Sequence, residues 1–177
     1  LDGEMKRLGV ECVRDTEGSL FVLGDKDLLY RAVYNILVNA YQAIGTNGTI
    51  HIRGKRRDDG MIALSFHDSG PGFPPALLHK LLDPFFTTKD HGTGLGLPIV
   101  NTIITSHNGK LLLTNPEEGG AMITILLPVA SEPDIGDTPE KDERPAASAD
   151  DEPVTLTDPL PSEKHDLREG DASPQTR

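Results

Sequence analysis

Apolar residues recur every three or four positions in residues 28–44, a spacing that predicts an amphipathic helix. Asp25 is suited to cap its N-terminus, and Gly45 is suited to end it. The apolar stripe consists of Leu29, Ala32, Val33, Ile36, Leu37, Ala40 and Ile44. On the opposite side lies a stripe of neutral amides, namely Asn35, Asn39 and Gln42. A solvated helix face usually carries Lys and Glu, so this amide stripe suits a partly enclosed polar cleft, with simple surface decoration as the open alternative.

Strands are predicted on both sides of this helix by short alternating or apolar runs. They occupy residues 10–14, 20–23, 49–53, 61–68, 110–114 and 121–128. Turn residues between neighbouring runs predict three hairpins, around residues 17–18, 58–60 and 117–120. Further helices are predicted at residues 1–8, 76–82 and 95–107. This order indicates an α+β fold, a two-layer sandwich with a mixed, mainly antiparallel sheet covered on one face by helices.

The stretch from residue 83 to residue 100 carries the strongest candidate chemistry. It begins with aromatic, hydroxyl and basic side chains, namely Phe85, Phe86, Thr87, Thr88 and Lys89. Glycines then alternate with other residues before a helix, in the order Gly92, Thr93, Gly94, Leu95, Gly96 and Leu97. A glycine backbone can approach a ligand closely, and a helix N-terminus favours phosphate through its unpaired N–H groups. The stretch therefore predicts a loop that grips phosphate.

Two further positions favour a polar ligand. Asp68 ends the predicted strand at residues 61–68 and is followed by the turn Ser69-Gly70-Pro71-Gly72. A carboxylate there is placed to accept a hydrogen bond from a ligand, and an ordinary Asx turn is the alternative reading of the motif alone. The amide oxygens of Asn35 and Asn39 are hard ligands of the kind that Mg²⁺ prefers.

Acidic charge is unevenly distributed along the chain. The formal net charge is -11, of which residues 131–177 carry -9 and residues 1–130 carry -2. We therefore expect a nearly neutral domain in residues 1–130 and a disordered, acidic, proline-rich tail in residues 131–177. A nearly neutral domain makes nucleic acid an improbable partner, and the short basic run Lys55-Arg56-Arg57 is more simply the solvated end of a hairpin.

The remaining composition limits the possible environments. Cys12 is the one cysteine, which excludes an intrachain disulfide and is compatible with a reducing compartment. No run of about 18 apolar residues is present, so no membrane-spanning segment is predicted. The chain begins at Leu1 and not at Met, which is compatible with a fragment of a longer protein.

Four motifs in order resemble those of the catalytic, ATP-binding domain of sensor histidine kinases, a superfamily shared with DNA gyrase B and MutL. Residues 35–40 are similar to its N box, residues 68–72 to its first glycine box, residues 83–89 to its F box and residues 92–97 to its second glycine box. The resemblance covers residues 1–128. The compact glycine-rich loop and the Gln42-Ala43 pair are most similar to the nitrogen-regulator type of kinase.

The resemblance implies a role for each matching residue. Asn39 matches the principal Mg²⁺ ligand, Asn35 supports metal and phosphates, and Asp68 matches the acceptor of the adenine amino group. The implied nucleotide-binding set is completed by Gln42, Gly70, Gly72, Phe85, Phe86, Thr87, Thr88, Lys89, Gly92, Thr93, Gly94, Leu95, Gly96 and Leu97. Within it the two phenylalanines are expected to anchor the loop to the pocket, and Lys89 is expected to approach the triphosphate. Ala121 stands where the family often has a threonine near the adenine.

The residue type at the position of Asn35 distinguishes the activities found in this superfamily. Its ATP-hydrolysing members and serine kinases carry Glu at the matching position as a general base, and an amide cannot take a proton at neutral pH. The resemblance thus implies transfer of the γ-phosphoryl group of Mg-ATP to a histidine, in a cytoplasmic domain. The implied partners are a dimerisation domain that carries the phosphoacceptor histidine and a response regulator. A degenerate ATP-binding sensor, or another ATPase or serine kinase of the superfamily, is the alternative.

Overall fold

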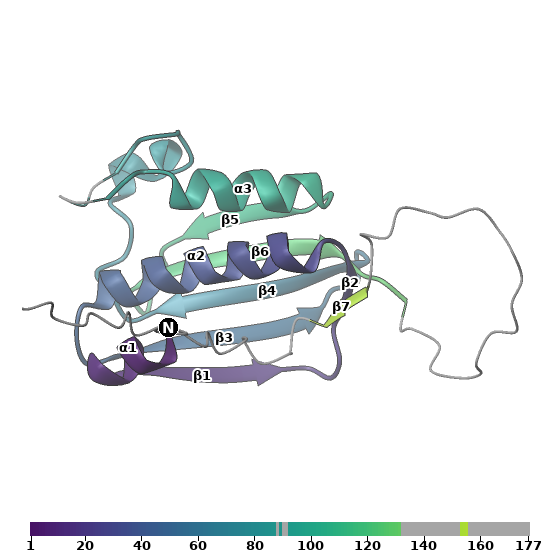
Figure 1. Ribbon diagram of the computed structural model, residues 1–177, viewed down its shortest axis with the longest axis horizontal. Coiled ribbons are helices and arrows are strands. Elements are labelled where there is room, and N and C mark those ends of the chain that lie inside the picture. Colours follow the sequence, from purple (N-terminus) through teal and green to yellow (C-terminus); the bar gives the residue numbers. More distant parts are fainter. Residues whose placement is uncertain (88, 90–91, 132–152, 156–177) are drawn as a thin grey trace, which may run out of the picture.

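A computed structural model describes residues 1–87, 89, 92–131 and 153–155 of the chain. Its main sheet has five strands in the order β1 (Val10–Thr16), β3 (Gly48–Arg56), β4 (Met61–Asp68), β6 (Ala121–Pro128) and β5 (Lys110–Thr114). β1 and β3 run parallel, whereas the other three neighbouring pairs are antiparallel. The helices α1 (Asp2–Arg7), α2 (Lys26–Ile44) and α3 (Gly96–Ser106) lie on one face of the sheet (Figure 1). The predicted mixed, mainly antiparallel sandwich is confirmed.

Helix α2 forms where the apolar stripe predicted it. The Asp25 side chain accepts a hydrogen bond from the backbone N–H of Leu28, which caps the N-terminus, and Gly45 follows the last turn. The buried side of the helix consists of Leu29, Ala32, Ile36, Leu37, Ala40 and Tyr41. These residues join one hydrophobic core with the buried positions of β4, among them Ile62, Leu64 and Phe66. The amide stripe is therefore left on a face that does not pack against the sheet.

The predicted hairpin of the first two strands is wrong. β1 pairs in parallel with β3, and β2 (Phe21–Leu23) pairs with β7 (Pro153–Thr155). Leu20 and Val22 are both almost fully buried, at 0% and 1% exposure. Because they are two residues apart in an extended segment, both side chains point to the same side of the chain, into the hydrophobic core. This burial is worth roughly 1.5–3 kcal/mol per side chain and holds the segment that leads into α2.

The segment after the first glycine box is tighter than predicted. Residues Pro75–Lys80 form a short 3₁₀ helix, η1, in which the Leu77 N–H donates to the Pro74 carbonyl over 2.9 Å. Pro74 is the N-cap and Pro75 is in the first turn, where a missing N–H costs no intrahelical hydrogen bond. The expected helix at residues 76–82 is present in this altered form.

The chain beyond residue 131 is described only at β7. Those three residues pair with β2 as a short strand, and the disordered tail expected over residues 131–177 stays a prediction. The rest of residues 132–177 lies outside the described residues, and the proposed boundary near residue 130 stays a prediction. Within the described residues no helix combines the length and the apolar character needed to cross a membrane.

Candidate functional site

The amide stripe of α2 faces the start of α3. A β-carbon added to Gly96, the first residue of α3, would lie 3.2 Å from Asn39 Nδ2 and 3.8 Å from Asn35 Oδ1. Asn35 Nδ2 donates to the Arg31 carbonyl over 2.8 Å, which fixes its side chain on the helix. The first turn of α3 therefore lies directly against these two amides. Its unpaired N–H groups give this position the electrostatic character that suits phosphate.

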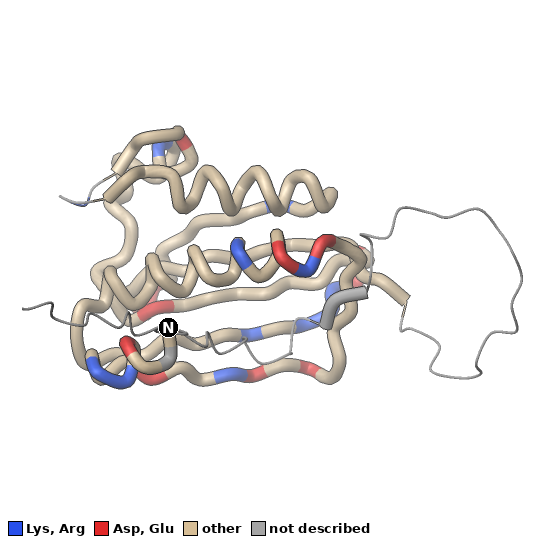
Figure 2. The backbone as a smooth tube through the Cα atoms, viewed as in Figure 1, with Lys and Arg blue, Asp and Glu red and all other residues tan. Residues whose placement is uncertain are grey.

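Few charged side chains surround these amides. Figure 2 shows that α3 and the C-terminal half of α2 are almost without charge. The sequence of α3 contains no Asp, Glu, Lys, Arg or His, and Arg31 is the last of these residue types in α2. The electrostatics of the site therefore depend mainly on Lys89 and Asp68.

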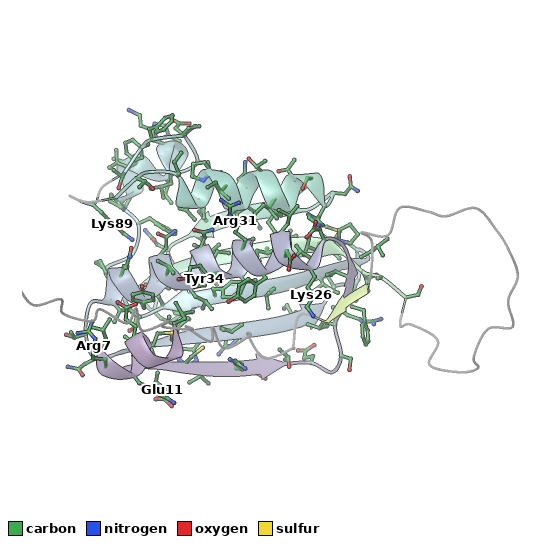
Figure 3. The ribbon with its side chains drawn as sticks, in the orientation of Figure 1. Arg7, Glu11, Lys26, Arg31, Tyr34 and Lys89 are labelled. Atoms are coloured by element: carbon green, nitrogen blue, oxygen red, sulfur yellow. The ribbon has the colours of Figure 1, made fainter. Side chains whose placement is uncertain are left out.

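Lys89 connects the loop before α3 to the amide stripe. Its Nζ atom donates to Gln42 Oε1 over 2.9 Å and to Asn39 Oδ1 over 3.3 Å. Figure 3 shows the Lys89 side chain directed toward the C-terminal half of α2. Burial of the ammonium end lowers the pKa of Lys89, and the negative charge of Asp68 partly opposes this. The sequence did not predict this contact of Lys89 with Gln42 and Asn39, and the expected approach of Lys89 to a triphosphate stays a prediction.

Asp68 is the one buried charged residue among those described, at 5% exposure. Its Oδ1 atom accepts hydrogen bonds from the backbone N–H groups of Gly70, over 2.9 Å, and Ala121, over 3.4 Å. Burial raises the pKa of Asp68, while these two donors and the nearby His67 and Lys89 act to lower it. Both hydrogen bonds end on the same oxygen, so the second carboxylate oxygen is oriented for a further donor.

The first glycine box, residues 68–72, is fixed to α2 on one side and to the hairpin of β5 and β6 on the other. A β-carbon at Gly70 would lie 3.3 Å from the backbone of Ala43, so this turn packs directly on α2. The Asn115 side chain clamps Phe73, because its Oδ1 accepts from Phe73 N over 2.8 Å and its Nδ2 donates to Phe73 O over 2.7 Å. Gly72 lies between these two anchors. The sequence did not identify Asn115, although its position before Pro116 is a known turn signal.

A hydrogen bond between backbone groups closes the base of the glycine-rich loop. Phe85 N donates to Gly94 O over 3.0 Å, and both residues have positive φ, +67° and +66°. A side chain at Gly94 would collide with the Phe85 backbone, which requires glycine there. The Phe85 side chain is 76% exposed, so the expectation that its ring anchors the loop is wrong. Phe86 is half-buried and is the better candidate for that role.

The other predicted members of the loop are placed as follows. Thr87 Oγ1 accepts from Lys89 N over 3.1 Å and contacts Gly92, which orders the approach to Lys89. Thr93 is exposed, whereas Leu95 and Leu97 are half-buried. Leu97 packs against the hydrophobic core and so secures the first turn of α3. Thr88 lies outside the described residues.

The residues that form this site fall within one family model. Residues 24–131 match the family described as histidine kinase-, DNA gyrase B- and HSP90-like ATPases. The chain belongs to this family. All four motifs lie within the matched region, as do the buried Asp68 and the Lys89 contact. The matched residues also contain α2, α3 and the four strands β3 to β6 of the main sheet.

Members of this ATPase family with named activities are similar to the chain. The signal transduction histidine-protein kinase AtoS of Escherichia coli (strain K12) is 42% identical over 105 residues, which cover 59% of this chain and 17% of AtoS. The catalytic domain of histidine kinase ThkA has 32% sequence identity and a TM-score of 0.66, covering 72% of this chain and 84% of that domain. ThkA in complex with the response regulator TrrA has 30% identity and a TM-score of 0.63, covering 73% of this chain and 37% of ThkA.

Proposed function

We propose that the chain is the catalytic domain of a protein-histidine kinase, which binds Mg-ATP and passes its γ-phosphoryl group to a histidine. One observation carries the proposal. A buried acceptor, Asp68, and a set of amide oxygens that already hold a cation lie on neighbouring elements of one site. A nucleotide needs both features, because its base presents donors and its triphosphate requires positive charge.

Asp68 is the residue proposed to select adenine. The amino group of adenine is a hydrogen-bond donor, whereas the matching position of guanine carries an acceptor oxygen. A buried carboxylate oxygen accepts a hydrogen bond from the amino group of adenine and repels the oxygen of guanine. Gly70 and Ala121 hold the carboxylate in place through Oδ1, and Asn115 holds the turn that forms the pocket wall. Ala121 takes part through its backbone N–H, so a hydroxyl at this position is not needed to orient Asp68.

Asn39 is the residue proposed to bind Mg²⁺, with Asn35 in support. The described residues contain no group of three or more His, Cys, Asp or Glu side chains that could hold a metal ion. A magnesium ion here would therefore rely on amide oxygens, water and the phosphates of its nucleotide, which is the coordination that Mg²⁺ prefers in nucleotide sites. The Asn39 oxygen fits this role because it already accepts from a cationic donor, Lys89. When bound, Mg²⁺ supplies charge neutralisation for the triphosphate.

Phosphoryl transfer of this kind depends on positioning and charge stabilisation. Lys89 supplies a cation beside the amide stripe, and the first turn of α3 supplies backbone donors. Asn35 cannot act as a general base, which favours a neutral histidine as acceptor over water or serine. The proposed acceptor lies on a separate dimerisation domain, and the phosphoryl group then passes to a response regulator. The complex of ThkA with TrrA supports a partner of this class.

The proposal is tested by nucleotide titration and by transfer to a supplied acceptor domain. We expect Mg-dependent binding of ATP, about tenfold weaker in Asn39→Ala as one charge-assisted contact is lost. Asn101→Ala, in the middle of α3, is the matched control and retains wild-type affinity. Radiolabel from ATP should appear on the acceptor domain and not on the chain itself. Binding without any transfer would indicate a degenerate sensor, and hydrolysis unaffected by Asn35→Ala would indicate a different ATPase mechanism.

A further inference from the structure

Lys89 and the amide stripe together form a filled cation site. The Nζ atom of Lys89 lies 2.9 Å from Gln42 Oε1 and 3.3 Å from Asn39 Oδ1. An ammonium group has three donors and no acceptor, so both contacts are charge-assisted hydrogen bonds to carbonyl oxygens. These neutral, hard oxygens are also of the type that binds Mg²⁺. The same pair of atoms is thus suited to two different cations.

The position of the two oxygens follows from the helix. Asn39 and Gln42 are three residues apart in α2, so their side chains lie next to each other on one face. The shorter contact is to Gln42, which makes this residue the stronger anchor of the ammonium. The carboxylate of Asp68 adds long-range attraction for positive charge at this point. Both α2 after Arg31 and the whole of α3 lack basic side chains, so Lys89 has no cationic neighbour on these helices.

We propose that the Lys89 ammonium and a divalent cation are alternative occupants of this oxygen site, so that the incoming metal displaces the lysine. The inference rests on the proposed function, because it takes Asn39 as the metal ligand. Two cations cannot share the Asn39 oxygen without strong repulsion at this distance. Displacement releases Lys89 toward the phosphates that arrive with the metal. Gln42 then serves as a holding residue for the lysine, a role separate from that of Asn39.

The test measures the binding of a metal alone, without nucleotide. Mn²⁺ prefers the same oxygen ligands as Mg²⁺ and broadens the NMR signals of nearby protons. In the ¹⁵N-labelled chain, broadening of the Asn39 side-chain amide signal reports occupation of the site. Removing the competing ammonium in Lys89→Met should lower the apparent Kd for Mn²⁺ by about three- to tenfold, a modest gain because the contact is partly exposed.

Three matched variants separate competition from indirect effects. Lys89→Arg keeps the positive charge and should retain an apparent Kd near that of the wild type. Lys80→Met removes an exposed lysine of η1 and should have no effect. In the double variant Lys89→Met/Asn39→Ala, followed through the Gln42 side-chain amide, the gain should disappear because the metal ligand is gone.

Equal Mn²⁺ broadening in the wild type and Lys89→Met would overturn the inference, as would a gain that persists without Asn39. Titration of the same samples with Mg-ATP distinguishes this failure from failure of the proposed function. If Mg-ATP binds while Lys89→Met leaves Mn²⁺ binding unchanged, only the displacement is refuted. If the wild type does not bind Mg-ATP, the proposed function itself fails.

Discussion

The backbone N–H of Gly70 donates a 2.9 Å hydrogen bond to the Oδ1 atom of Asp68, and this contact orients the one buried carboxylate among the described residues. Ala121 N–H reaches the same oxygen over 3.4 Å. The second oxygen is therefore the one oriented to meet a ligand. Burial without an ion pair is costly for a carboxylate, which suggests that Asp68 serves binding at the expense of stability.

Asp68→Asn should weaken adenine recognition without destabilising the protein. An amide in place of the carboxylate loses the charge-assisted hydrogen bond to the adenine amino group, which corresponds to about tenfold or more in affinity. Titrations with ATP and GTP should show a smaller difference between the two nucleotides than in the wild type. Asp15→Asn, on an exposed position of β1, is the control. If the ATP and GTP affinities do not respond to Asp68→Asn, the assignment of the pocket is wrong.

The same substitution should change how stability depends on pH. The pKa of Asp68 is raised above its usual value of 3.8, chiefly by burial, so the folded state favours the protonated form. The stability that this group contributes is fully present below that value and is lost as the pH rises through the raised pKa. The free energy of unfolding of Asp68→Asn should therefore exceed that of the wild type by more at pH 7 than at pH 4. Denaturant titration at the two pH values measures this, and a wild-type advantage at pH 7 would contradict it.

Local signals explain which parts of the fold could be predicted. Helix α2 has an apolar stripe, an Asp25 cap and a Gly45 end, and all three are encoded within 21 consecutive residues. The β3–β4 hairpin is likewise encoded by its own turn at residues 58–60. The partner of β1 is not encoded in this way, because β3 lies beyond a whole helix. Alternation in residues 10–14 predicts a strand but not its neighbour, which is why the predicted first hairpin was wrong.

The same difference between local signals and long-range contacts applies to the candidate site. The motifs identified Asn39, Asp68 and Lys89 by their local context. The contact between Lys89 and Asn39, however, joins residues 50 positions apart, and the electrostatic influence of Asp68 on Lys89 also depends on the folded chain. The exposed ring of Phe85 was not predictable, since its backbone conformation turns the side chain outward. Asn115 is a single polar residue after a strand, and only the folded structure reveals its two hydrogen bonds to Phe73.

Gly96→Ala should impair metal-dependent nucleotide binding while leaving the fold intact. The added methyl group would lie 3.2 Å from Asn39 Nδ2, so the proposed metal ligand must shift. Alanine also favours a helix over glycine by up to about 1 kcal/mol, so thermal stability should be equal or higher. Titration with Mg-ATP and with ATP in EDTA should show that the loss of affinity is largest with the metal. Gly3→Ala, in α1, meets nothing within 4 Å and is the matched control; an equal response of both variants would refute the close approach.

His107→Ala should destabilise the junction between α3 and α2. The ring donates from Nδ1 to the Ile103 carbonyl over 2.7 Å and accepts at Nε2 from the Asp25 backbone N–H over 3.0 Å. Loss of the ring leaves this N–H without its acceptor at the start of α2, which costs about 1–3 kcal/mol. Thermal denaturation should show a clearly lower Tm than for the wild type. His79→Ala, at an exposed position of η1, should change the Tm little, and equal Tm values for the two variants would show that the bridge is not stabilising.

Val154→Pro should loosen β2 without affecting the nucleotide site. Val154 pairs with Val22 in the two-stranded sheet, and proline removes a backbone N–H and disrupts strand pairing. Hydrogen exchange at the amides of residues 21–23 should accelerate by about fivefold or more, because their protection depends on this local pairing. Nucleotide affinity should stay at the wild-type value, since β2 and β7 lie at the end of the sheet opposite to Lys89 (Figures 1 and 3). Val154→Ala keeps the N–H and should retain slow exchange, so equally fast exchange in both variants would show that the effect is not due to backbone pairing.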